Sequence, residues 1–297
     1  MISRLASAIL PALLVLSLAS AGRAMPVVPE QSRFFVASDG VRLHYLEAGR
    51  GHTIVFIPGW DMPAWIWQRQ IDDLARFYHV VAFDPRSQGD SDIAPTGNEP
   101  FRRGQDIAEL LATVSLEPVV LVGWSLGVLD ALAYVHEHGD NRLAGLVLVD
   151  NSVGEDPAPL PPAVPRGVRR ARMRVSRELQ MRRFVAGMFH TPQPEEFLDR
   201  LTETALRTPP AISAELLEYP VPRSYWKEAI YATYKPILYV VRPSLEGQAD
   251  NLQARHAGAE TAIFADAGHA LFIDDADRFD DLVENFVQRR VWPGRVR

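Results

Sequence analysis

The stretch Val119-Val120-Leu121-Val122-Gly123-Trp124-Ser125-Leu126-Gly127 carries the clearest structural signal in the chain. Its first four residues are aliphatic, as in a strand buried on both faces, and a segment with helical spacing of apolar residues follows. A glycine two residues before Ser125 and another two residues after it allow a sharp strand-to-helix turn, because larger side chains there would clash with neighbouring backbone. The pattern places Ser125 on this turn, which is typical of a nucleophilic serine.

Apolar runs alternate with helix-like segments from Leu43 onward. The predicted strands are residues 43–47, 53–57, 79–83, 119–123, 145–149, 237–241 and 261–265. The predicted helices are residues 67–77, 105–114, 126–138 and 277–289. This alternation predicts an α/β fold with a mostly parallel central sheet and helices on both faces.

The alternation stops at Asn151 and resumes near Lys235, and a proline-rich segment opens the interval. We interpret residues 151–232 as a helical cap or lid inserted into a core made of residues 32–150 and 233–297. Prolines stiffen such a hinge because each fixes its backbone angle φ. A surface insertion unrelated to the substrate is the alternative.

Two further segments follow strand-like runs and carry chemistry. Gly268-His269-Ala270 comes late in the chain, and His269 is the best candidate for a general base because an imidazole titrates near neutrality. Ile57-Pro58-Gly59-Trp60 follows the strand-like residues 53–56 in the first part of the chain.

His136 and His138 are two residues apart on a predicted helix, so they point to different faces and do not form a metal site.

The order of loop, serine and histidine resembles that of the α/β-hydrolase family, and the resemblance extends over nearly all of the chain beyond residue 32. The segment Asp84-Pro85-Arg86-Ser87-Gln88-Gly89-Asp90-Ser91 is similar to the family's Asp-x-Arg-Gly-x-Gly-x-Ser loop. Ser87 replaces the usual glycine, which we expect to alter the loop geometry slightly but not the chemistry. The resemblance implies a serine-acid-histidine triad and an oxyanion hole formed by the backbone N–H groups of Trp60 and Leu126.

The acid of this triad has more than one candidate. Family members most often carry it after the seventh strand, where this chain offers Glu246 one position late and Asp250 further on. A minority carry it after the sixth strand, which here ends in Asp150. We favour Asp150 because a stiff apolar strand holds it, although an aspartate there could also serve only to bind loop amides.

Residues 1–24 have the pattern of a secretory signal peptide, with Arg4 followed by an apolar stretch and then small residues. We expect cleavage near residue 21 or 24 and a periplasmic or secreted protein. A retained membrane anchor is the alternative, but the apolar run is shorter than the about 20 residues that span a bilayer. The chain has no cysteine, which excludes disulfides and a lipobox.

The charge balance of 31 basic and 37 acidic residues argues against a nucleic-acid partner. The predicted cap is nevertheless rich in arginine, at positions 166, 169, 170, 172, 174, 177, 182 and 183. A solvated helix face explains such a run, and attraction of an acidic substrate or a membrane surface is the sharper hypothesis. We expect no cofactor and no metal, because no phosphate-binding glycine loop, dinucleotide fingerprint or zinc spacing is present.

These features predict an exported serine hydrolase, a carboxylesterase or lactonase acting on a small ester or lactone with an apolar acyl part. Serine at the turn argues against the dehalogenase and epoxide hydrolase branches of the family, which use aspartate there. Thioesterase, carbon-carbon bond hydrolase, haloperoxidase-like and aminopeptidase activities remain alternatives because they share the constellation. A ligand-binding receptor on a hydrolase scaffold is an alternative of another class. The residues Trp60, Met62, Trp65, Trp67 and Trp124 would line an apolar pocket or pack the first helix.

Overall fold

The computed structural model of the protein describes residues 29–159 and 176–294. Eight strands form one sheet in the order β1-β2-β4-β3-β5-β6-β7-β8. β1 pairs antiparallel with β2, and β2 pairs antiparallel with β4, whereas all the other pairs are parallel. The strands are β1 (Gln31–Val36), β2 (Arg42–Gly49), β3 (Thr53–Ile57), β4 (His79–Asp84), β5 (Val119–Trp124), β6 (Leu143–Val149), β7 (Ile237–Val241) and β8 (Ala259–Ile263). The predicted fold class is confirmed.

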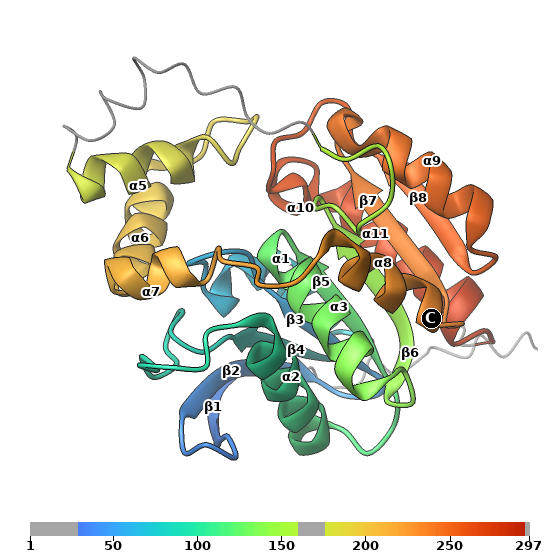
Figure 1. Ribbon diagram of the computed structural model, residues 1–297, viewed down its shortest axis with the longest axis horizontal. Coiled ribbons are helices and arrows are strands. Elements are labelled where there is room, and N and C mark those ends of the chain that lie inside the picture. Colours follow the sequence, from blue (N-terminus) through green and yellow to red (C-terminus); the bar gives the residue numbers. More distant parts are fainter. Residues whose placement is uncertain (1–28, 160–175, 295–297) are drawn as a thin grey trace, which may run out of the picture.

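Helices cover both faces of this sheet (Figure 1). One hydrophobic core joins the sheet to α2 (Pro100–Val114), α3 (Leu126–His138), α8 (Arg223–Ala232) and α9 (Glu246–Arg255). The other core joins it to α1 (Gln68–Leu74), α10 (Leu271–Asp274) and α11 (Ala276–Phe286). Successive residues of β5 alternate between the two cores, Val120 and Val122 in one and Leu121 in the other. This two-sided burial explains why the strand is apolar at each position.

The sequence pattern missed one strand and misplaced several boundaries of strands and helices. β1 lies at the edge of the sheet, and most of its side chains are exposed, so it lacks the continuous apolar signal of the inner strands. β8 begins at Ala259, two residues before the predicted start, and all of its residues are only partly buried. α2 begins at Pro100, whose fixed φ suits the first turn of a helix, rather than at residue 105.

The segment between β6 and β7 contains α5 (Arg177–Ala186), α6 (Glu195–Leu206), α7 (Pro210–Glu215) and α8. In Figure 1, α5, α6 and α7 lie together to one side of the sheet, whereas α8 lies beside α3. The division of residues 32–297 into a core and a cap remains a prediction; below, the cap names α5, α6, α7 and the residues that join them. The signal segment and Arg166 to Arg174 lie outside the described residues. Within the described ranges, none of the helices has the length and hydropathy needed to cross a membrane.

Candidate active site

Ser125 lies on the turn between β5 and α3, with φ 55° and ψ −118°. This left-handed conformation is costly for a residue with a side chain, so surrounding contacts must hold it. A Cβ on Gly123 would lie 2.2 Å from the carbonyl oxygen of Gly127, and a Cβ on Gly127 would lie 2.5 Å from that of Ile57. Close backbone contact therefore requires the two glycines, as the sequence pattern predicts.

The structure brings the three predicted triad side chains together at the carboxyl ends of β5, β6 and β8. His269 Nε2 lies 2.8 Å from Ser125 Oγ, and His269 Nδ1 lies 2.7 Å from Asp150 Oδ2. The His269 side chain retains 23% of its exposure, whereas that of Asp150 has none. Ser125 and His269 are 144 positions apart in the sequence, and both hydrogen-bond distances are within the normal range. Their chemical roles remain predictions.

Asp150 is held in place from two sides. Arg242, just after β7, donates its backbone N–H to Asp150 Oδ1 at 3.0 Å and its Nε to Oδ2 at 2.6 Å. Burial alone would raise the pKa of Asp150, but the hydrogen bonds and charges of His269 and Arg242 outweigh it, so the pKa lies below the usual value. The carboxylate therefore stays ionised near neutral pH and can orient the imidazole.

The alternative acids do not occupy this position. Glu246 and Asp250 are exposed residues of α9, and the Nδ1 atom of His269 contacts Asp150. The signal that distinguishes Asp150 is its conformation, with φ 50° at the end of β6, together with the Arg242 hydrogen bonds from the adjacent strand. Neither could be read from the sequence.

Trp60 and Leu126 occupy the positions expected for the two oxyanion donors. Leu126 is the first residue of α3, where backbone N–H groups have no acceptor within the helix. Trp60 follows Gly59, and a Cβ on Gly59 would lie 3.0 Å from Ser125 Cβ, so this loop lies directly against the serine. Their role as donors remains a prediction.

The loop that carries His269 is tied to the cap and to the core. Asp274 accepts backbone N–H bonds from Gly268 at 2.7 Å and from His190 and Thr191 at 2.8 Å each. The indole Nε1 of Trp124 donates to the carbonyl oxygen of His269 at 2.8 Å. These contacts limit the movement of the imidazole relative to Ser125, as catalysis by proton transfer requires.

Behind this loop, Gln70 Nε2 donates to the carbonyl oxygen of Phe272 at 3.0 Å and to Asp280 Oδ1 at 2.9 Å. Burial raises the pKa of Asp280 to about 7, helped by the nearby carboxylates of Asp73 and Asp277 and opposed by the Gln70 hydrogen bond and Arg69. The ionised form of Asp280 is thus disfavoured in the folded protein.

We expect this shift to appear in the pH dependence of stability. The unfolded protein loses the Asp280 proton near the ordinary aspartate pKa of 3.8, whereas the folded protein keeps it up to about pH 7. The contribution of Asp280 to the free energy of unfolding is therefore complete below pH 3.8 and is lost as the pH rises to the folded-state pKa of about 7. The total loss is roughly 4 kcal/mol. Denaturant unfolding of wild type and Asp280→Asn at pH 4, 6 and 8 measures it, since the variant does not titrate there. A difference between the two proteins that is independent of pH contradicts the assignment.

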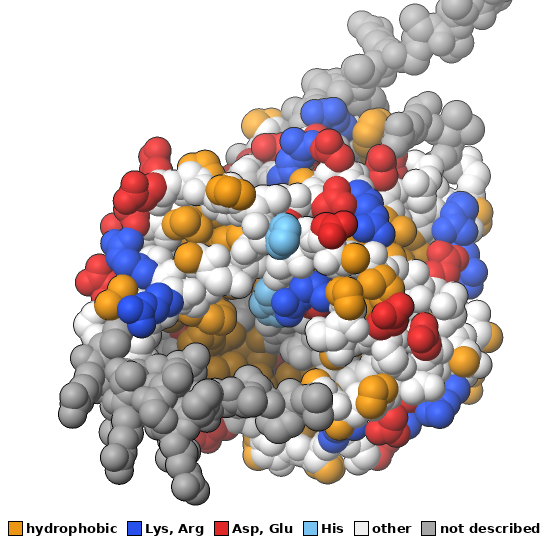
Figure 2. Space-filling model, turned by 90° about the horizontal axis from the view of Figure 1, so that it is seen from above, with side chains coloured by type: hydrophobic (Ala, Val, Ile, Leu, Met, Phe, Trp, Pro, Cys, Tyr) orange, Lys and Arg blue, Asp and Glu red, His pale blue; other side chains and the backbone are white. Residues whose placement is uncertain are grey.

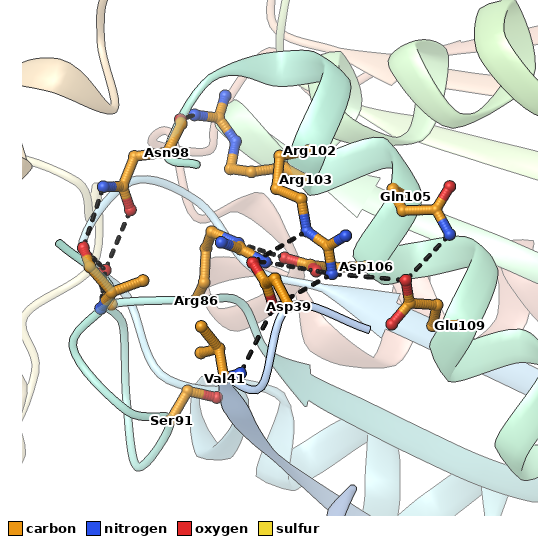
Figure 3. Close-up of polar contacts among 12 residues, drawn as sticks. Asp39, Val41, Arg86, Ser91, Asn98, Arg102, Arg103, Gln105, Asp106 and Glu109 are labelled. Carbon is orange, nitrogen blue, oxygen red and sulfur yellow. Dashed lines mark hydrogen bonds and ion pairs between the residues drawn. The ribbon is translucent and has the colours of Figure 1, made fainter. Parts of the chain in front are cut away.

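An ion-pair network anchors the loop after β4 (Figure 3). The fully buried Arg86 donates to Asp106 at 2.5 and 2.7 Å and pairs with Asp39 at 3.0 Å, and Arg102 also pairs with Asp106 at 2.8 Å. Ser87, with φ 66°, takes the left-handed conformation for which glycine is usual. Its hydroxyl donates to Asn98 Oδ1 at 3.0 Å, which ties the loop together. Gln88, the next residue, bonds to the backbone of Gly59 and of Asp61, so the loop after β4 also holds the loop that carries Trp60.

The aromatic residues near the site divide between the core and the cap. Trp67 is fully buried and stacks on Phe272 at 3.9 Å, so it packs α1 rather than lining a pocket. Trp65 packs against Phe197 of α6, and the half-buried Trp60 meets Phe184 of α5 edge-on at 5.0 Å. Seen from above, the surface is hollowed beside histidine side chains, and hydrophobic side chains line the hollow (Figure 2).

Among the described residues, His44, Asp84 and Asp90 form a group whose ligand atoms lie within 4.8 Å of one another. No sequence pattern gives His44 a chemical neighbour, yet its Nδ1 lies 2.6 Å from Asp84 Oδ2. Asp84 also accepts backbone N–H bonds from Ala64 and Asp90. Its oxygens are therefore already satisfied within the protein, and we assign no metal to this group.

The described arginines of the cap are partly used in contacts of the cap itself. Arg182 pairs with Glu178 and Asp199, and Arg177 donates to the carbonyl oxygens of Leu206 and Thr208. These contacts favour a structural role for both residues. Attraction of an acidic substrate or a membrane surface by the cap remains a hypothesis.

The fold and the serine-histidine-aspartate arrangement together define a hydrolase-type site, and comparison with known proteins gives the family. The profile of the Alpha/beta hydrolase family matches residues 54–282, so the chain belongs to this family. A non-heme haloperoxidase from Rhodococcus erythropolis is 36% identical over 117 residues, which cover 39% of this chain and 43% of the relative. The chain thus spans less than half the length of the curated relatives it matches.

Solved structures extend the likeness over most of the chain. The esterase RhEst1 from Rhodococcus sp. ECU1013 has a TM-score of 0.74 and 24% identity, covering 87% of this chain and 99% of that one. Est816, described as an N-acyl homoserine lactone degrading enzyme, has a TM-score of 0.69 and 23% identity, covering 86% of this chain and 100% of that one. At these identities the likeness shows the fold alone.

Proposed function

We propose that this protein hydrolyses carboxylic esters or lactones through an acyl-enzyme on Ser125. The observation that carries the proposal is the continuous contact from Ser125 Oγ to His269 Nε2, at 2.8 Å, and from His269 Nδ1 to Asp150, at 2.7 Å. A neutral serine hydroxyl is a weak nucleophile, and an adjacent imidazole held in one tautomer activates it. The esterase and the lactone-degrading enzyme of the same fold are consistent with this reaction class.

In this mechanism Ser125 Oγ attacks the carbonyl carbon while its proton passes to His269 Nε2. The carbonyl oxygen becomes negative and accepts hydrogen bonds from the backbone N–H groups of Trp60 and Leu126. His269 then returns the proton to the leaving alcohol, and water repeats the sequence on the acyl-enzyme to release the acid. Asp150 stays ionised throughout and stabilises the imidazolium.

The acyl part of the substrate is apolar in this proposal, because Trp60, which follows Gly59 beside Ser125, packs against Phe184, and Figure 2 shows a hollow with hydrophobic side chains next to histidine side chains. Each additional buried methylene contributes about 0.8 kcal/mol, or roughly a fourfold gain in kcat/KM until the pocket is full. Export to the periplasm or the medium is part of the proposal and is supported by the pattern of residues 1–24 alone.

We expect a series of 4-nitrophenyl esters of graded acyl length, measured beside simple lactones, to show hydrolysis that rises with chain length and then levels off. The Ser125→Ala variant supplies the background rate. A folded wild-type protein that hydrolyses none of these compounds contradicts the proposal and favours the binding-protein alternative.

A further inference from the structure

Two neighbouring residues of the loop after β3 hold the same residue of the cap. The indole Nε1 of Trp60 donates to the carbonyl oxygen of Ser213 at 2.7 Å, and the Ser213 hydroxyl donates to Asp61 Oδ2. Ser213 lies in α7, and it is 152 positions away from Asp61. The loop that carries the expected Trp60 donor is therefore attached to the cap by both a backbone and a side-chain contact.

Asp61 is an unusual residue for a simple packing contact. It is fully buried, has φ 55°, and its Oδ1 has no hydrogen-bond partner among the described residues. Burial raises the pKa of Asp61 to about 6, although the hydroxyl groups of Ser213 and Thr208 and the charge of Arg177 oppose it. The Ser213 hydroxyl is a specific partner for this side chain, and any side chain that offers an acceptor oxygen at the same place can keep the bond.

The core holds the same loop from the other side through Gln88. Gln88 Oε1 accepts the backbone N–H of Asp61 at 2.7 Å, and its Nε2 donates to the carbonyl oxygen of Gly59 at 3.3 Å. Trp60 lies between these two attachment points, so a change at Asp61 would rotate the peptide groups on either side of Trp60. An oxyanion donor is effective only when its N–H points at the developing charge.

We propose that Asp61 is a positioning residue that, through Ser213, holds the Trp60 N–H in its oxyanion-binding orientation while the cap is docked. This inference rests on the proposed function and adds to it a requirement for cap contact during the chemical step. It predicts that loss of the Asp61–Ser213 bond weakens stabilisation of the transition state more than binding of the substrate.

The test uses Asp61→Ala, Ser213→Ala and the double variant, with two controls. Asp61→Asn retains an oxygen that accepts the Ser213 hydroxyl and tolerates the positive φ. Arg207→Ala removes a different contact between cap and core, because Arg207 bonds to Gly89 and Asp90 rather than to the Trp60 loop. The readouts are kcat and KM on a 4-nitrophenyl ester, the inhibition constant of a trifluoromethyl ketone that forms a tetrahedral adduct, and amide hydrogen exchange of residues 58–64.

We expect Asp61→Ala and Ser213→Ala to lower kcat by about 10- to 100-fold and to weaken the ketone by a similar factor, with KM changed by less than about threefold. The double variant should have a kcat no lower than that of the poorer single variant, because both single changes break the same hydrogen bond. Asp61→Asn and Arg207→Ala should stay within about threefold of wild type.

The proposal is overturned if folded Asp61→Ala and Ser213→Ala keep kcat and the ketone affinity, if Asp61→Asn loses as much as Asp61→Ala, or if Arg207→Ala causes the same loss. Hydrogen exchange separates this failure from failure of the proposed function. If wild type proves inactive on esters, faster exchange of residues 58–64 in Ser213→Ala but not in Arg207→Ala still supports the attachment, and unchanged exchange in both overturns it.

Discussion

Replacement of Ser125 by alanine is expected to lower the rate of ester hydrolysis by about a million-fold without unfolding the protein. The Ser125 hydroxyl lies 2.8 Å from His269 Nε2, whereas His269 Nδ1 contacts Asp150. Removal of this hydroxyl therefore leaves no nucleophile for the acyl-enzyme route. Alanine leaves both flanking glycines in place, and therefore keeps the backbone contacts that define the turn. The comparison requires matched thermal unfolding curves, because a misfolded variant would also be inactive.

The second large effect is expected at Asp150. Asp150→Asn should lower kcat by about 10,000-fold, because the amide cannot hold the Nδ1–H tautomer or offset the charge of the imidazolium. The matched variant Glu246→Gln should retain activity within about twofold, since Glu246 is an exposed residue of α9.

Steady-state kinetics of both purified variants decide between these acids. Collapse of turnover in folded Glu246→Gln, with activity kept in Asp150→Asn, would show that the assignment is wrong. Because the pKa of Asp150 is lowered, we also expect that protonation of this carboxylate does not cause the loss of kcat/KM on the acid side of neutrality.

Much of the fold could be predicted from local pattern. The inner strands are buried on both faces, so their apolar runs are continuous, and the glycines around Ser125 mark the turn. β1 could not be found this way because an edge strand with exposed side chains has no such run. The predicted start of β8 is two residues late for a related reason, since its residues are only half-buried.

The site was less accessible to sequence reasoning where it depends on contacts between distant segments. Asp150 and Glu246 both follow strands. Asp150 is distinguished as the partner of His269 by its backbone conformation and by its hydrogen bonds to Arg242, which only the structure shows. The ties from Asp61 to Ser213 and from Asp274 to His190 join residues separated by 152 and 84 positions. No periodicity or spacing signals such contacts, so the connection between cap and catalytic loops is visible only in the folded protein.

Labelling with a fluorophosphonate, followed by mass spectrometry of the peptides, tests the nucleophilic role of Ser125 most directly. We expect a single adduct in wild type, located on the peptide that contains Ser125, and none in folded Ser125→Ala. A folded wild-type protein that takes up no probe, or a Ser125→Ala variant that is labelled to the same extent, would contradict it.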